Sequence, residues 1–225
     1  MKKILALATC FNRKERTVSS VKDLTEGNPE LEFEFLIVDD GSTDGTREAL
    51  EQFPNVTVLE GSGNLYYSGG MRLAISEAKQ RTGNGYDYCL LFNDDVEFFP
   101  HGIEYLVNLR NDVVWVGPTR NAKTSHIYSG VSRKSKFVPK YVHLMGEDDT
   151  GVPCETLNGN CILLPWHIFM EVPNIPKIYH HALGDYAYGF GITDKGYQIL
   201  VPPQLDRKST RLNSSHTDSS RMPYH

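Results

Sequence analysis

Short apolar runs alternate with amphipathic stretches over the first half of the chain. Residues 4–10 form a continuous apolar run, which is typical of a buried strand, and Val18, Val21 and Leu24 follow at helical spacing. Similar pairs recur up to residue 116. The pattern predicts helices at 14–24, 43–53, 68–81 and 100–110, and further strands at 33–38, 56–59, 88–92 and 113–116.

Strands that alternate with helices at this spacing form right-handed βαβ units. The sequence therefore predicts an α/β fold with a mostly parallel central sheet and helices on both faces. Residues 117–155 interrupt the pattern, because they are rich in Lys, Ser, Thr and Gly, and we expect loops and a hairpin there. Order resumes with strands predicted at 160–164 and 198–201 and helices predicted near 166–170 and 185–195.

The segment 206–225 differs in composition from the rest of the chain. It holds five serines and shows neither helical nor strand periodicity. Residues 206–216 resemble the translation of a common DNA-sequencing adapter. We therefore expect a non-native, disordered tail after a catalytic domain that spans 1–205 and is truncated at its C-terminal end. A native Ser-rich terminus is the alternative.

Composition and charge narrow the classes of function. The chain has 225 residues, with 23 Lys+Arg against 28 Asp+Glu and a net charge of −5. This balance argues against nucleic acid as a partner, because phosphate backbones attract a basic surplus. The four cysteines lack C-x-x-C spacing, and neither a signal peptide nor a membrane span is evident. We expect a cytoplasmic protein.

Acidic residues follow two of the predicted strands. Asp39 and Asp40 come after strand 33–38, and Asp94 and Asp95 come after strand 88–92; a third carboxylate turn, at Asp185, lies late in the chain. Ligands of open α/β sheets bind beyond the carboxyl ends of the strands, so these side chains are expected to meet at one site. Carboxylates there suit a divalent cation that neutralises a phosphate leaving group. The alternative is that Asp, Gly and Ser simply favour turns after strands.

Five stretches of the sequence together resemble the family 2 inverting glycosyltransferases, whose catalytic domain has the GT-A fold. The most specific is FLIVDDGSTDGT at 35–46. The others are TCFNR at 9–13, GNLYYSGG at 63–70, NDD at 93–95, and NGNCILL at 158–164 followed by HALGD at 181–185. The third and fifth of these look most similar to the rhamnosyltransferase-like branch.

The resemblance implies a role for each matching residue. Asp40 would hydrogen-bond the base of a nucleotide-sugar donor, and Asp94 would face its ribose. Asp95 would bind Mg²⁺ or Mn²⁺ at the diphosphate, and Asp185 would be the general base. The other donor-binding residues that it implies are Thr9, Asn12, Arg13, Asp39, Tyr67, Gly69, Gly70 and Asn93.

These roles imply transfer of a sugar, with inversion, from a UDP-, dTDP- or GDP-sugar to a hydroxyl group. The acceptor would be a glycan, a polysaccharide or a lipid-linked oligosaccharide, and a lipid-linked acceptor would bring the protein to the inner face of the membrane. The glycines at 69 and 70 have two open interpretations: they bring backbone N–H groups to a phosphate, or they permit close packing.

Two positions depart from the family pattern. Where similar proteins often carry GDYDYGLR, this chain has GDYAYGFG, so Ala187 replaces an acid and Gly191 replaces an arginine. A non-catalytic protein that binds sugar nucleotides therefore stays open as an alternative function. A sugar nucleotidyltransferase is a third function, although residues 9–13 lack the glycine-rich basic loop that such enzymes carry.

Overall fold

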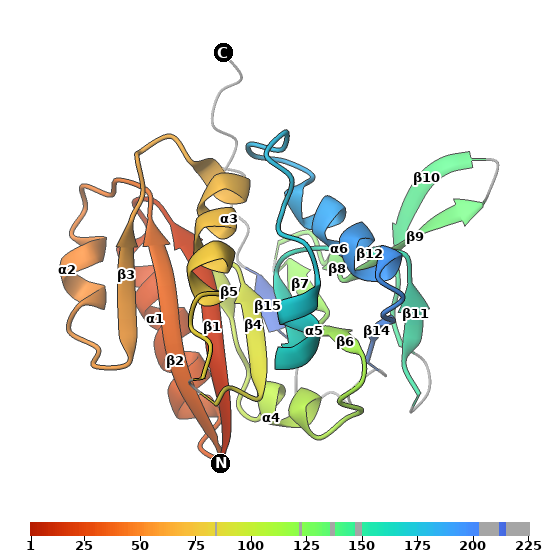
Figure 1. Cartoon of the computed structure of the whole chain (residues 1–225), viewed down its shortest axis with the longest axis horizontal. Helices are drawn as coiled ribbons and strands as arrows, with labels where there is room; N and C mark the ends of the chain where they lie inside the picture. Colours follow the sequence, from red (N-terminus) through yellow and green to blue (C-terminus); the bar gives the residue numbers. More distant parts are fainter. Residues whose placement is uncertain (84, 122, 136–137, 147–149, 203–211, 215–225) are drawn as a thin grey trace.

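An eight-stranded sheet forms the centre of the computed structural model, which describes residues 1–83, 85–121, 123–135, 138–146, 150–202 and 212–214 (Figure 1). The strand order is β11-β14-β6-β13-β4-β1-β2-β3. The strands are β1 (Lys2–Cys10), β2 (Leu31–Asp39), β3 (Val56–Glu60), β4 (Tyr88–Phe92), β6 (Val114–Val116), β11 (Val152–Cys154), β13 (Cys161–Pro165) and β14 (Ile199–Val201). Four of the seven pairings are parallel, and β13 and β11 run antiparallel to their neighbours. The prediction of a mainly parallel sheet is confirmed.

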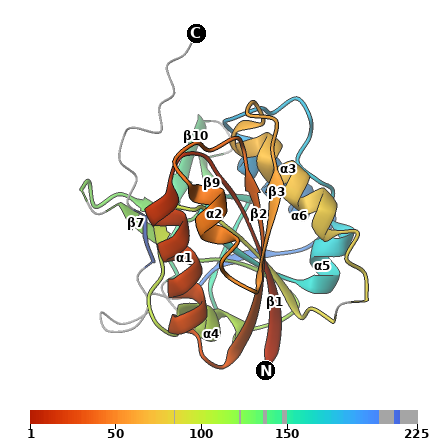
Figure 2. The ribbon, with the colours of Figure 1, turned by 90° about the vertical axis from the view of Figure 1, so that its left-hand side faces the viewer.

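Helices cover both faces of the sheet, as predicted. Figure 2 shows α1 (Lys14–Gly27), α2 (Thr46–Leu50) and α4 (Gly102–Val107) on one side, with α3 (Tyr66–Ala78), α5 (Trp166–Glu171) and α6 (Gly184–Asp194) on the other. Alternate residues of β1 point to opposite faces. Ile4 and Ala6 join the core under α1 and α4, whereas Leu5 and Leu7 join the core under α3, α5 and α6.

Two helices are shorter than the periodicity predicts. The helix expected over 43–53 is limited to α2, because Gly45 is left-handed (φ 82°) and the Asp44 carboxylate accepts the Thr46 N–H just after it. The helix expected over 100–110 is limited to α4, which begins after His101 at φ 61°. Local turn geometry at the N-terminus therefore overrides the apolar spacing in both cases.

Residues 117–155 contain more regular structure than expected. The predicted hairpin is present as β9 (Gly130–Ser135) and β10 (Val138–His143), which pair antiparallel and project from the body in Figure 1. β9 also pairs with β12 (Thr156–Leu157). A separate small sheet contains β5 (Val96–Glu97), β7 (Thr119–Asn121), β8 (Ile127–Tyr128) and β15 (Leu212–Ser214).

The predicted tail 206–225 is described only at β15, which pairs with β5 and β7. Its other residues lie outside the described part of the chain, so its non-native origin stays a prediction. Among the described helices, none combines the length and apolarity needed to cross a bilayer.

Candidate functional site

A cavity of about 940 Å³ lies beyond the carboxyl ends of β1, β2 and β4. Parallel strands in this sheet bring their carboxyl ends to one edge, which is where the acidic turns were expected to meet. The structure brings together these predicted site residues on the cavity wall: Thr9, Asn12, Arg13, Asp40, Tyr67, Asn93, Asp94, Asp95 and Asp185.

Three helices begin at the wall of this cavity. Residues at the starts of α1, α3 and α6 line it, so the N-terminal ends of three helices approach the same space. Helix N-termini carry partial positive charge and suit anions such as phosphates. Asn12, Tyr66 and Leu183 adopt left-handed backbone (φ 50°, 53° and 66°) on this wall, a conformation that is costly for Tyr and Leu and is often found at ligand sites.

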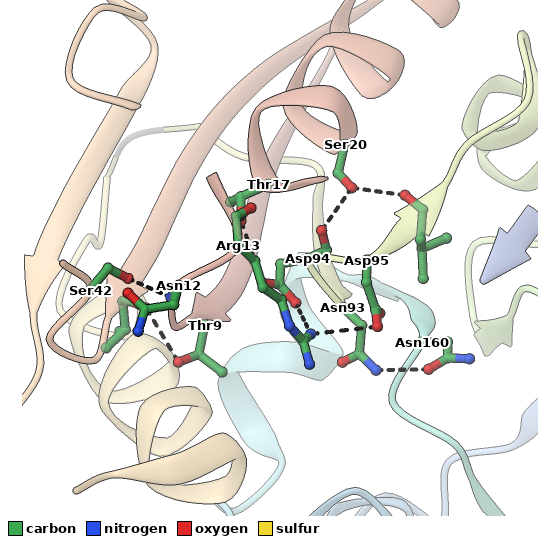
Figure 3. A network of polar contacts seen from close by, with 12 residues as sticks. Thr9, Asn12, Arg13, Thr17, Ser20, Ser42, Asn93, Asp94, Asp95 and Asn160 are labelled. Atoms are coloured by element: carbon green, nitrogen blue, oxygen red, sulfur yellow. Dashed lines mark hydrogen bonds and ion pairs between the residues drawn. The ribbon is translucent and has the colours of Figure 1, made fainter. Parts of the chain in front are cut away.

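Arg13 bridges the two carboxylates that follow β4 (Figure 3). Its Nη1 lies 2.8 Å from Asp94 Oδ1 and 3.4 Å from Asp95 Oδ2, and the two acidic residues are only 3% and 4% exposed. Thr17 Oγ1 also donates to Asp94 Oδ2 at 3.3 Å. Burial raises the pKa of Asp94 to about 6; the Asp95 carboxylate adds to this rise, and Arg13 opposes it. The pair therefore depends on a nearby positive charge.

Asn93 connects this acidic pair to the residue that precedes the neighbouring strand β13. Its Nδ2 donates to Asn160 Oδ1 at 2.7 Å, and Asn160 Nδ2 donates to Thr119 Oγ1 at 2.6 Å. The buried Asn93 Oδ1 has no hydrogen-bond partner among the residues that the structure describes. A buried amide oxygen in that state is ready to accept from a ligand or to bind a cation.

The chemistry of this cluster fits a divalent cation. Asp94 and Asp95 supply carboxylate oxygens, and Asn93 supplies an amide oxygen, which are the ligands that Mg²⁺ and Mn²⁺ favour. Within the described ranges, no three His, Cys, Asp or Glu side chains lie close enough to hold a metal by themselves. The remaining ligands of such a cation would be waters or phosphate oxygens.

Asp40 is the anchor of the loop that leads into α3. Its Oδ1 accepts the Gly63 N–H at 2.8 Å, and its Oδ2 accepts those of Leu65 and Tyr66 at 2.8 and 2.9 Å. The sequence predicted that Asp40 hydrogen-bonds the base of the donor and did not predict that it holds the loop before α3. The contact with a donor stays a prediction, since Asp40 still borders the cavity.

Three predicted donor-binding residues do not line the cavity. The Asp39 carboxylate is 2% exposed, accepts the Ser42 N–H at 2.9 Å and lies 3.8 Å from Arg47 Nε. Gly69 and Gly70 are buried in α3. A Cβ on Gly70 would overlap Thr9 Oγ1, so this glycine allows α3 to pack closely on β1. The geometry at Gly70 thus favours the packing interpretation over phosphate binding.

Asp185 lies in the first turn of α6, on the same cavity as the Asp94 and Asp95 pair. Its Oδ2 accepts the Gly159 N–H at 3.0 Å and its Oδ1 accepts the Tyr186 N–H at 2.8 Å, which fixes the plane of the carboxylate. Burial raises the pKa of Asp185 above its ordinary value. A Cβ on Gly159 would overlap the Tyr67 hydroxyl and touch Asp185, so this glycine lets the Tyr67 hydroxyl pack beside the acid.

Arg72 holds the segment that leads to Asp185, and sequence reasoning did not single it out. Its guanidinium donates to the carbonyl oxygens of Ile175, Pro176 and Tyr179 at 2.6–3.1 Å. Ser68 adds bonds from its N–H and hydroxyl to the carbonyls that follow Tyr179 in the same segment. No sequence signal marks these contacts, because their partners are backbone groups about 100 residues away.

Most of the predicted motifs lie within the part of the chain that matches a known protein family. A sequence profile described as glycosyl transferase family 2 matches residues 7–158, which include four of the five predicted motifs and the start of the fifth. The chain belongs to glycosyl transferase family 2. The resemblance inferred from DDGS and NDD is therefore confirmed, and with it the prediction of a glycosyltransferase.

A relative in family 2 is the N-acetylglucosaminyl-diphospho-decaprenol L-rhamnosyltransferase of Mycobacterium tuberculosis. It is 21% identical over 211 residues, which cover 81% of this chain and 68% of that protein. The rhamnosyltransferase-like branch inferred from the motifs agrees with this similarity.

Solved glycosyltransferase structures share the fold. The mannosyltransferase PcManGT from Pyrobaculum calidifontis, in complex with GDP-Man and Mn²⁺, aligns with a TM-score of 0.62 at 12% identity, over 95% of this chain and 57% of that one. TarS of S. aureus aligns with a TM-score of 0.65 at 15% identity, over 96% of this chain and 37% of that one. The family 2 chain thus spans less than two thirds of either structure, and the GT-A fold prediction is confirmed.

Replacing Asp40 with Asn tests the anchor of the α3 loop in this glycosyltransferase. An amide has one acceptor oxygen, so D40N loses at least one charge-assisted bond, and we expect the free energy of unfolding in urea to fall by about 1.5–3 kcal/mol. Hydrogen exchange at the Gly63, Leu65 and Tyr66 amides should accelerate. The exposed Asp112→Asn is the control; unchanged exchange in D40N would contradict the assignment.

Proposed function

We propose that this protein transfers a sugar, with inversion, from a nucleotide-diphosphate sugar to an acceptor hydroxyl. The observation that carries the proposal is that Asp185 and the Asp94–Asp95 pair line one cavity. A single displacement needs a base beside the acceptor hydroxyl and positive charge beside the leaving diphosphate. Asp185 would meet the first requirement, and a cation held by the Asp94–Asp95 pair would meet the second.

The donor half of the proposed site lies at the ends of β1, β2 and β4. Asp95, with Asp94 and the Asn93 amide oxygen, would hold Mg²⁺ or Mn²⁺. When bound, such a cation neutralises charge on a diphosphate leaving group. The N-terminal end of α1, which carries partial positive charge, borders the same part of the cavity. A UDP-, dTDP- or GDP-sugar is the proposed donor, with its base toward Asp40 and Thr9.

The acceptor half is built around Asp185. In the proposed reaction its carboxylate takes the proton of the acceptor hydroxyl while the oxygen attacks the anomeric carbon and the diphosphate departs. Burial raises the pKa of Asp185, which makes the carboxylate a better proton acceptor, and two N–H donors hold its orientation. Ala187 and Gly191, the two departures from the family pattern, do not line the cavity, which favours an enzyme over a non-catalytic binding protein.

We further propose an acceptor sugar linked to a polyprenyl diphosphate, at the inner face of the membrane in the cytoplasm. The similarity to a rhamnosyltransferase named for a decaprenol-linked acceptor supports this choice. Leu183, just before α6, and Ile178, in the preceding segment, are 58% and 80% exposed. They provide an apolar surface near the proposed base on which the polyprenyl group would pack.

Removing the proposed base should abolish turnover and spare donor binding. With Asp185→Asn, we expect kcat to fall roughly 10²–10⁴-fold while the Kd of the donor stays within about twofold, because the amide keeps the shape but cannot take a proton. Because the ionised form is the active one and burial raises its pKa, wild-type kcat should fall on acidification with a midpoint above 3.8.

The control for this variant is Asp194→Asn, an exposed acid at the other end of α6, which should keep wild-type turnover. Substantial turnover in D185N would sink the assignment of the base.

Calorimetric titration tests the donor half. One of UDP, dTDP and GDP should bind with an affinity that Mn²⁺ increases, and Asp95→Ala should lose that increase, because one carboxylate ligand of the cation is gone. The exposed Asp112→Ala should behave as wild type. Nucleotide binding that Mn²⁺ leaves unchanged in the wild type would count against a metal at Asp95.

A further inference from the structure

The Arg13 guanidinium occupies the space that a cation between Asp94 and Asp95 would need. A single nitrogen, Nη1, lies within 3.4 Å of one oxygen from each carboxylate. Figure 3 shows the side chain reaching from the start of α1 to both acids. A divalent cation that takes the same two oxygens cannot share them with the guanidinium. The two positive charges would also repel at that separation.

Two buried carboxylates at neighbouring positions need such a charge. Isolated buried ions are costly, and like charges side by side raise that cost. Asp94 receives a second donor, Thr17 Oγ1, and Arg13 brings a positive charge to both acids. The arginine thus supplies the stabilisation that the pair requires before any ligand is present.

The backbone around Arg13 is fixed, but its side chain has room to move. The Asn12 N–H donates to Ser42 Oγ at 2.9 Å, Asn12 Oδ1 accepts the Thr43 N–H at 2.8 Å, and the Arg13 carbonyl accepts the Thr17 N–H at 2.9 Å. The Arg13 side chain is 31% exposed and borders the open cavity. The guanidinium is therefore able to leave the carboxylates through side-chain rotation, with the turn unchanged.

We propose that Arg13 is an internal counterion that competes with a divalent cation for Asp94 and Asp95 and turns to the donor diphosphate when the cation binds. This inference rests on the proposed function, specifically on the metal at Asp95. It makes Arg13 a positioning residue that lowers the affinity of the empty site for metal.

The competition has a measurable consequence. If the carboxylate pair is free of Arg13 for only a fraction of the time, the apparent Kd for the cation rises by the inverse of that fraction. Metal and donor then bind with positive coupling, because a diphosphate that attracts the guanidinium frees the carboxylates. A purely structural ion pair would give the opposite response, since its loss would disorder the metal ligands and weaken metal binding.

The test is titration of the full chain with Mn²⁺ alone, with free Mn²⁺ followed by electron paramagnetic resonance. Arg13→Gln removes the competing charge, and we expect Mn²⁺ to bind about tenfold more tightly than in the wild type. The matched control is Arg16→Gln, which removes the same charge from the same helix and the same cavity wall. Urea unfolding of each variant verifies that it is folded, and Arg13→Lys serves if R13Q is not.

The outcomes distinguish a competing counterion from a structural ion pair and from a general electrostatic effect. Tighter Mn²⁺ binding in R13Q than in R16Q supports the counterion. An equal gain in both variants means a general electrostatic effect and overturns it, as does unchanged or weaker binding in R13Q. If Arg13→Lys is used, its affinity should exceed that of the wild type, because the ammonium is more strongly hydrated than a guanidinium and sits on a shorter side chain, so it competes less well for two buried carboxylates; equal or lower affinity overturns the counterion. If Mn²⁺ binds to none of the proteins, the metal assignment of the proposed function fails together with this inference.

Discussion

Two adjacent buried carboxylates at the end of β4 impose the constraint on which the site depends. Two buried negative charges side by side are costly without a positive charge nearby, and Arg13 brings that charge from the start of α1. Ser20, further along α1, donates to the carbonyls of Asp94 and Val96 at 3.2 and 2.8 Å. The same contacts that stabilise the acids therefore dock α1 on the β4–β5 turn and set one wall of the cavity.

The other wall is built from the starts of α3 and α6, and α6 carries the proposed base. Asp40 fixes the loop before α3, and Gly70 lets the helix approach β1. From α3, Arg72 and Ser68 bind the backbone of the segment that ends at Asp185. The acidic pair and the base thus belong to separate parts of the chain, and both border the same cavity.

Sequence patterns predict the framework because strand and helix periodicities differ and acidic turns follow buried strands. They place Asp94 and Asp95 at one edge of the sheet, since parallel strands share a carboxyl edge, whereas the role of Asp185, which lies in α6, comes from the family resemblance. They do not reveal that Asp39 accepts the Ser42 N–H, or that Asp40 accepts N–H groups of the loop before α3. The sequence cannot distinguish the hydrogen-bond partners of two adjacent aspartates in one motif. Within residues 117–155 only the hairpin is predicted: the other short strands pair with distant partners, so local spacing carries little information about them.

The central claim is that this cavity holds a donor diphosphate between a metal at Asp95 and the base Asp185. Its most direct test is a crystal structure of the protein with Mn²⁺ and the nucleoside diphosphate that it binds. The account predicts Mn²⁺ contacting Asp95 and the phosphates, with the terminal phosphate on the side of the cavity that faces Asp185. A nucleotide bound outside the cavity, or a diphosphate remote from Asp95, would contradict it.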